Sequence, residues 1–96
     1  MLLSIAVSPD GNVVHLHADA EGLLSLEREI RRIRELAERG ECEDGHFFSP
    51  AWGGNDLSET MLSDEAEGGW SQVDHLKLFG WTPEWSEKHG LSSPAP

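Results

Sequence analysis

Histidine is the residue type whose spacing in this chain most directly suggests chemistry. His15 and His17 are two positions apart in a segment of alternating side chains, so both would project from one face of a β-strand. His46 and His75 lie in two other segments with strand-like patterns. Three or four imidazoles on one sheet face can bind Zn²⁺ or another borderline metal. One alternative is therefore a small metal-binding domain that uses these four residues, but solvent-facing histidines on a half-exposed sheet give the same pattern. We assign no metal and no cofactor.

The other residues that could react are poorly placed for catalysis. Cys42 lies between Glu41 and Glu43, whose negative charges oppose formation of a thiolate. The pair Gly53-Gly54 lacks the further glycines and the lysine of a phosphate-binding loop. Acid–base catalysis by carboxylates would need a shaped pocket, and a domain of one helix on one sheet offers little concavity. We therefore predict that the protein is not an enzyme.

Negative charge is concentrated in the second half of the chain. The 96 residues contain 18 Asp and Glu against 7 Lys and Arg, and the net charge is −11. From residue 41 to residue 67 there are eight acids and no Lys or Arg. Such a charge disfavours binding to nucleic acids and to anionic membranes, and it favours a basic protein partner. A solvated loop region that is kept soluble by its charge is the alternative explanation.

Aromatic residues are interleaved with these acids. Tryptophan beside glycine in a loop is suited to anchor an interface, because Trp is enriched among the residues that dominate binding energy, although packing inside the domain is an alternative for each ring. The predicted partner-binding residues are Asp44, Trp52, Asp56, Glu59, Asp64, Glu65, Glu67 and Trp70.

Two elements that would position these residues are clear from local patterns. The segments 2–7 and 12–18 alternate on either side of Pro9-Asp10-Gly11, which predicts a β-hairpin with one buried face. Apolar residues then recur at spacings of three and four from Leu23 to Ala37, which predicts an amphipathic helix. Asp19 would cap its beginning, and Gly40 would end it.

Strand-like segments follow the helix. They cover residues 45–49 and 72–79, residues 57–62 could be a strand or a helical turn, and residues 64–69 should form a loop. The expected fold is α+β, a two-layer sandwich in β-β-α-β-β order, with one long helix packed on a four-stranded, mostly antiparallel sheet. The domain should span residues 1–81, and residues 82–96 should form a Pro/Ser-rich C-terminal tail that is partly mobile. The opposite sheet face would be uncovered, and self-association through it into a homodimer is a further alternative.

The composition also indicates a compartment. A single cysteine cannot form an internal disulfide, no apolar run approaches the length of a membrane span, and residues 1–8 do not look like a signal peptide. We therefore expect a soluble, cytoplasmic protein.

Three short motifs resemble a family of small bacterial immunity proteins of polymorphic toxin systems. They are Gly45-His46-Phe47-Phe48, Trp52-Gly53-Gly54-Asn55-Asp56-Leu57 and Val73-Asp74-His75-Leu76-Lys77-Leu78, and the similarity spans roughly residues 1–79. The resemblance implies an α+β protein that neutralises a cognate toxin by binding it. The acidic charge suggests a toxin with a basic substrate groove, such as a nuclease.

Overall fold

The computed structural model describes residues 1–92 and divides the strands between two small sheets. The described elements are β1 (Leu3–Val7), β2 (Val14–Ala18), α1 (Ala20–Glu38), β3 (Glu43–Phe48), the 3₁₀ helix η1 (Pro50–Trp52), α2 (Ser63–Glu67), β4 (Ser71–Gln72), β5 (His75–Gly80) and α3 (Pro83–Lys88). One sheet has the strand order β2-β1-β4, and the other pairs β3 with β5. All the pairings are antiparallel. The α+β class is thus confirmed, whereas the predicted single four-stranded sheet is wrong.

The hairpin of β1 and β2 forms as its turn residues predict. The Asp10 carboxylate accepts hydrogen bonds from the Ser8 hydroxyl at 2.6 Å and from the Asn12 N–H at 3.0 Å, and Gly11 takes a φ of 77°. The register pairs Ser4 with His17, so His17 shares a face with small residues of β1. The expected common face of His15 and His17 is therefore present.

Helix α1 begins and ends as the capping residues predict. The Asp19 carboxylate accepts a hydrogen bond from the Gly22 N–H at 2.8 Å, and this bond is the largest cause of the lowered pKa of Asp19. Beyond the C-cap at Arg39, Gly40 has a φ of 84°. Both ends are fixed by local hydrogen bonds and backbone conformation, which is why the sequence was sufficient to predict them.

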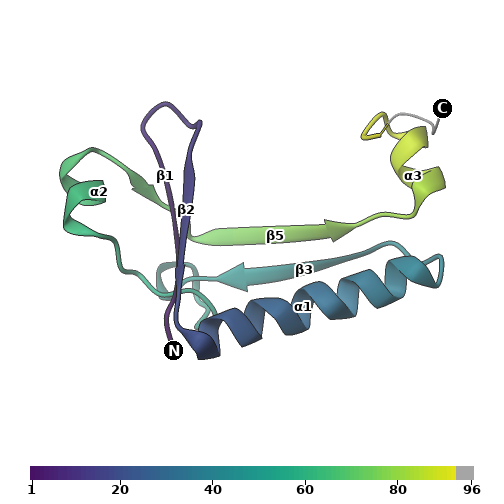
Figure 1. Ribbon diagram of the computed structural model, residues 1–96, viewed down its shortest axis with the longest axis horizontal. Helices are drawn as coiled ribbons and strands as arrows, with labels where there is room; N and C mark the ends of the chain where they lie inside the picture. The colour runs from purple at the N-terminus through teal and green to yellow at the C-terminus, as the bar shows by residue number, and fades with distance from the viewer. Residues whose placement is uncertain (93–96) are drawn as a thin grey trace.

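Helix α1 lies along one face of the β3–β5 hairpin (Figure 1). A Cβ atom at Gly80 would collide with the Ile33 side chain, so the helix and strand approach closely at this point. Arg32 also donates a hydrogen bond to the Asp44 carbonyl oxygen at 2.9 Å. A two-stranded sheet is narrower than the apolar stripe of the helix, however, and Ile30 is 48 % exposed while Ile33 is 6 % exposed. The stripe is therefore only partly buried.

The chain crosses from one sheet to the other at Val73 and Asp74. The Val73 N–H donates to the Ile5 carbonyl oxygen at 2.8 Å, whereas the Asp74 carbonyl oxygen accepts from the Ser49 N–H at 2.9 Å. The Ser49 hydroxyl also donates to the Asp74 carboxylate at 2.7 Å. The segment that alternation predicted as one strand, residues 72–79, is thus split into β4 and β5, and this crossing prevents a single sheet.

The segment between η1 and β4 also differs from the prediction. Residues 57–62 form neither a strand nor a helical turn, and the expected loop at 64–69 contains helix α2. Leu57 is nevertheless only 2 % exposed, because it joins Leu3, Ile5 and Phe47 in the core cluster. This segment is therefore held by burial and by scattered hydrogen bonds rather than by a regular element.

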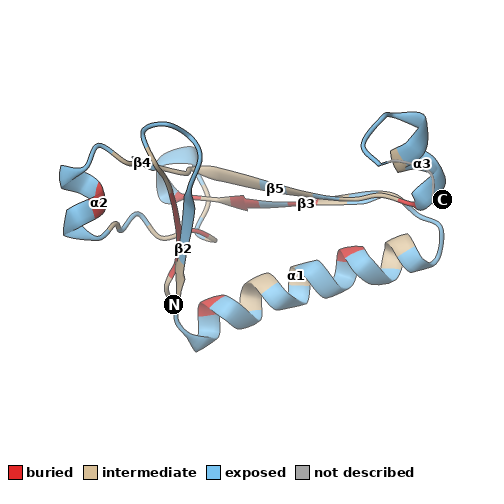
Figure 2. Cartoon of the chain, turned by 45° about the horizontal axis from the view of Figure 1, so that its top comes forward, coloured by how far each residue is buried: buried red, intermediate tan, exposed pale blue. Residues whose placement is uncertain are grey.

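The core lies where the two sheets meet, and most of the molecule away from it is exposed (Figure 2). The β1–β2 hairpin runs across one end of the β3–β5 hairpin, with α2 beyond it and α3 at the far end (Figure 1). The molecule measures 45 × 28 × 23 Å, so it is elongated.

The predicted boundary at residue 81 falls next to an ordered element. Helix α3 begins after Thr82, whose hydroxyl accepts a hydrogen bond from the Trp85 N–H at 3.3 Å. Part of the predicted tail is thus helical. The expectation of mobility for the last residues falls on residues 93–96, which lie outside the described part of the chain.

Candidate functional site

The structure separates the predicted partner-binding residues into two groups. Asp44, Trp52, Asp56 and Glu59 come from β3, η1 and the loop that follows η1. Asp64, Glu65, Glu67 and Trp70 come from α2 and the chain that leads to β4. Helix α2 lies beyond the β1–β2 hairpin, away from most of β3 and β5 (Figure 1). The single acidic surface that the sequence predicted is therefore two surfaces.

The first group borders the face of the β3–β5 hairpin that points away from α1, which we call the outer face. Alternation along the two strands places six side chains there: Asp44, His46, Phe48, His75, Lys77 and Phe79. Helix α1 lies on the opposite side of these two strands (Figure 2), and η1 reaches only the end of the outer face at His75, through Trp52. Sequence reasoning selected only Asp44 of the six for a partner site, although the alternation in both strands would have indicated the others.

Charges on the outer face are paired with one another. The Asp44 carboxylate lies 3.5 Å from the Lys77 ammonium group and 3.6 Å from the Nε2 atom of His46. The His46 ring in turn hydrogen bonds to the His75 ring at 2.8 Å. The centre of the face is therefore a partly exposed polar network.

Stacked rings extend from both ends of this network. The Phe48 and His75 rings stack with their centroids 4.3 Å apart, and Trp52 tilts toward His75 at 6.1 Å. At the other end, Phe79 stacks on Trp81 at 5.3 Å. The row of rings then continues from Trp81 into the predicted tail, through Trp85 and His89.

Trp52 is the most exposed aromatic residue near the outer face, with 61 % of its surface accessible. Its neighbours in sequence are fixed by two of the predicted acids. The Glu59 carboxylate accepts from the Ala51 N–H at 2.5 Å, and the Asp56 carboxylate accepts from the Phe48 N–H at 3.2 Å. These two acids therefore shape the loop that presents the Trp52 ring.

In the second group, Glu65 is not a surface residue. It is 3 % exposed, whereas Asp64 and Glu67 on the same helix are exposed. Helix α2 has only five residues and packs one side on the β1–β2 hairpin, so the residue on that side is buried. A segment this short has too few residues for its periodicity to show which side that would be. Glu65 is therefore not part of the exposed surface to which the sequence assigned it.

Glu65 instead joins two of the histidines. Its Oε2 atom lies 2.7 Å from Nδ1 of His15 and 2.9 Å from Nε2 of His17, and its Oε1 atom accepts from the Leu62 N–H at 2.8 Å. The hydrogen bond from His17 is the largest cause that lowers the pKa of Glu65, from 4.5 to about 2, and His15 and Leu62 add to it while desolvation opposes it. The carboxyl group is therefore ionised near neutral pH. We call these three residues the His15–His17–Glu65 cluster.

The four histidines do not form one site. His46 and His75 belong to the β3–β5 sheet, whereas His15 and His17 belong to the other sheet and meet Glu65. The alternative of one metal-binding domain assumed a single sheet, and the structure does not bring the four side chains together in that way.

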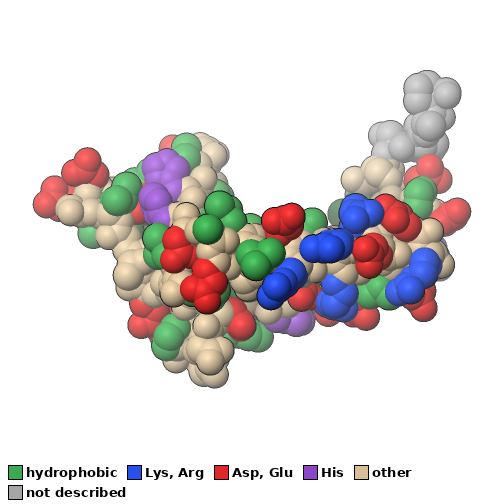
Figure 3. Space-filling model, turned by 60° about the horizontal axis from the view of Figure 1, so that its bottom comes forward, with side chains coloured by type: hydrophobic (Ala, Val, Ile, Leu, Met, Phe, Trp, Pro, Cys, Tyr) green, Lys and Arg blue, Asp and Glu red, His purple; other side chains and the backbone are tan. Residues whose placement is uncertain are grey.

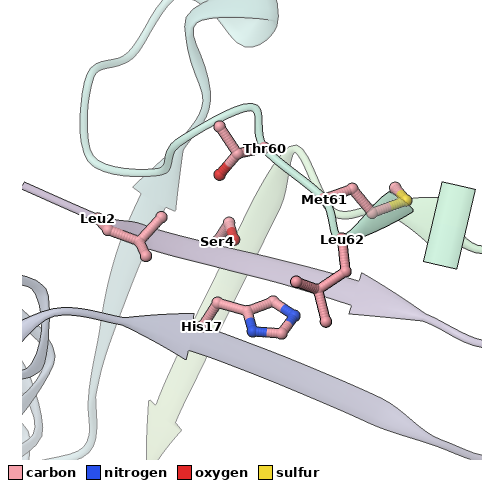
Figure 4. A pocket seen from close by; sticks show the side chains of 6 residues that line it. All are labelled: Leu2, Ser4, His17, Thr60, Met61 and Leu62. Carbon is pink, nitrogen blue, oxygen red and sulfur yellow. The ribbon is translucent and has the colours of Figure 1, made fainter. Parts of the chain in front are cut away.

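A cavity of about 160 Å³ borders the His15–His17–Glu65 cluster through His17 (Figure 4). Its lining comes from the beginning of the chain, from β1, from β2 and from the segment before α2: Leu2, Ser4, His17, Thr60, Met61 and Leu62. Ser4 is buried, and its hydroxyl has no hydrogen-bond partner among the described residues. Sequence reasoning did not select Ser4, and a serine between apolar residues in a strand gave no signal.

Basic side chains are gathered along α1 (Figure 3). Five of the seven Lys and Arg residues belong to this helix or its C-cap: Arg28, Arg31, Arg32, Arg34 and Arg39. Among residues 1–92, no helix combines the length and the apolar character that crossing a membrane requires.

Comparisons of the chain with protein-family models, with curated proteins and with solved structures found no match.

Proposed function

We propose that this protein is an immunity protein, which binds a cognate bacterial toxin in the cytoplasm and neutralises it without chemistry of its own. The observation that carries the proposal is the outer face of the β3–β5 hairpin, where exposed rings lie along the same face as the partly exposed Asp44 carboxylate. The resemblance of the three sequence motifs to immunity proteins supports the same role. Two of these motifs contribute side chains to the outer face, and the third provides Trp52.

The proposed contact surface consists of the outer face and Trp52. Interfaces commonly have a few aromatic residues that carry much of the binding energy, surrounded by polar groups that exclude water. The Trp52 side chain is exposed, and the hydrogen bond between the Ala51 N–H and Glu59 holds the loop that carries it, as an anchor of this kind requires. Glu59 also supplies negative charge in the loop that carries Trp52, where its carboxylate binds the Ala51 N–H.

The proposed partner is a toxin whose contact surface is basic. A net charge of −11 attracts such a surface at long range and repels nucleic acids. An acidic protein can occupy the groove in which a nuclease would bind phosphates, so a nuclease is the toxin class that this charge favours.

The test is the affinity of the full chain for the toxin encoded beside it, measured with matched variants. Trp52→Ala should weaken binding at least about 30-fold, as expected for an interface anchor. Glu59→Lys should weaken it about tenfold or more, whereas Glu27→Lys, which changes an exposed acid of α1 by the same charge, should have an effect of less than about threefold.

Two outcomes would contradict the proposal at different levels. If Asp64→Lys and Glu67→Lys weaken binding while Trp52→Ala does not, the contact surface is at α2 and not on the outer face. If the chain does not bind the toxin at all, the immunity function itself is wrong.

The affinity for the toxin should also fall as salt rises from about 50 to about 500 mM, because charge pairs across the interface are screened. An affinity that does not change over this range would exclude electrostatic recognition.

A further inference from the structure

We propose that the His15–His17–Glu65 cluster is a binding site for a divalent transition-metal ion, with Zn²⁺ the ion that fits it best. This site is distinct from the outer face and does not depend on the immunity function.

The donor set is appropriate for zinc. Two imidazoles and one carboxylate are a common set of three protein ligands, with water in the fourth position. The three ligand atoms all lie within 4.8 Å of one another. Nitrogen donors also distinguish the site from those of Ca²⁺ and Mg²⁺, which prefer oxygen ligands throughout.

Metal binding would require only small movements of the side chains. Bonds of about 2 Å at tetrahedral angles place neighbouring ligand atoms about 3.3 Å apart. The carboxylate oxygen now lies 2.7 and 2.9 Å from the two ring nitrogens, and all three atoms lie within 4.8 Å of one another, so side-chain movements of about 1 Å would bring them to this spacing. The rings would then present lone pairs to the ion in place of N–H groups.

The surroundings hold the ligands in position. Glu65 is buried, and its second oxygen is fixed by the Leu62 N–H, which leaves the first oxygen directed at the histidines. The His15 ring stacks on Trp70 with the centroids 4.3 Å apart. Such support around metal ligands improves affinity because less order is lost on binding.

The neighbouring cavity is a second, independent observation. It reaches the cluster at His17, and the buried Ser4 hydroxyl in its lining has no protein partner. A cavity of this size holds several waters, and an unpartnered buried hydroxyl needs one. A water bound to the ion beside His17 could be reached from this cavity, so the site would have an exchangeable fourth ligand.

The ion would link two distant parts of the chain. His15 and His17 belong to β2, whereas Glu65 belongs to α2, and the segment 49–62 that leads to α2 has little regular structure. An ion that binds the folded state and not the unfolded state stabilises the protein. Saturation of the site with zinc should therefore raise the melting temperature.

The test is calorimetric titration of ZnCl₂ into the full chain after removal of metals with EDTA, at about pH 7.5, where free imidazole is mostly deprotonated. We expect one ion per chain with a Kd below about 10 μM, and a melting temperature raised by about 10 °C at a hundredfold excess over Kd. MgCl₂ should produce neither effect.

Matched variants assign the binding to the cluster. His15→Gln changes a partly exposed side chain and should fold; it should weaken zinc binding at least about 30-fold, and Glu65→Gln should do the same. The double variant His46→Gln and His75→Gln, which removes the other histidine pair, should change the Kd by less than about threefold. A Kd of about 10 μM or weaker for the unaltered chain, or an equal loss in the His46 and His75 variant, would overturn the proposal.

Discussion

At the scale of single residues, burial distinguishes side chains that the sequence pattern treats alike. Glu65 and Glu67 are two positions apart in one acidic segment, yet the first is enclosed with two histidines and the second faces solvent. Ile30 and Ile33 belong to one apolar stripe, yet only Ile33 is buried. Substitution of each pair should therefore give unequal results.

The two isoleucines provide the first prediction. Ile33→Ala should lower the free energy of unfolding by about 2–4 kcal/mol, because it leaves a cavity between α1 and Gly80. Ile30→Ala should cost less than about 1 kcal/mol, since its side chain is half exposed and the change improves helix propensity. Urea denaturation of both variants is the measurement. Equal losses would show that Ile30 is also buried in solution.

Asp19 provides a prediction on pH. The Gly22 N–H lowers its pKa below 3.8, so the folded state binds this proton less readily than the unfolded state does. The stabilisation by the carboxylate is thus fully present above pH 3.8 and is lost as the pH falls through the lowered pKa.

The variant Asp19→Asn tests this prediction, because Asn keeps a capping oxygen but does not titrate. The unaltered chain should be the more stable of the two at neutral pH, since a negative charge is favourable at a helix N-terminus. The difference should shrink as the pH is lowered below 3.8. Urea denaturation across that range is the measurement, and a difference that does not depend on pH would contradict the assignment of the cap.

At the scale of elements, the fold depends on close contact between α1 and its neighbours. A Cβ atom at Gly22 would collide with the Leu2 carbonyl oxygen, which is backbone and cannot easily move. The Asp19 N–H also donates to this oxygen, at 3.1 Å. The first turn of the helix is thus held directly against the beginning of β1.

This contact reverses an expectation from helix propensity. Considered alone, Gly22→Ala should stabilise a helix by about 1 kcal/mol. In this fold it should destabilise the protein by about 2 kcal/mol or more, because the backbone of α1 must move away from β1. Ser25→Ala on the same helix is the control, with an expected effect of about 0.5 kcal/mol or less. Thermal unfolding followed by circular dichroism measures both, and a stabilised Gly22 variant would contradict the contact.

At the scale of the whole molecule, two small sheets in place of one give an elongated shape. The Cα radius of gyration is 15.6 Å, whereas a compact domain of this length has about 12.5 Å. The core occupies the junction of the sheets, so much apolar surface of α1 and of the outer face is exposed. This geometry leaves the outer face of the β3–β5 hairpin and part of the apolar stripe of α1 exposed.

Small-angle scattering tests the shape and also the alternative of self-association. A monomer with a radius of gyration of about 16 Å is expected from these dimensions. A value near 12.5 Å would show that the two sheets pack together more closely in solution. A mass that rises toward twice 10.6 kDa with concentration would instead favour a homodimer.

The sequence alone determined the parts of this protein that depend on neighbouring residues. The β1–β2 hairpin, the caps of α1 and the common face of His15 and His17 follow from turn chemistry, capping and periodicity, and these act over a few residues. The concentration of negative charge likewise needed only the composition.

The tertiary structure decided what depends on residues far apart in the chain. The crossing at Val73 and Asp74 is set by hydrogen bonds to β1 and to Ser49, and no local pattern distinguishes it from a continuous strand. The meeting of Glu65 with His15 and His17 spans about fifty positions and required the packing of α2 on the β1–β2 hairpin. Strand partners and buried pairs are chosen by the burial of the whole chain, because periodicity fixes which face a residue takes but not what that face will meet.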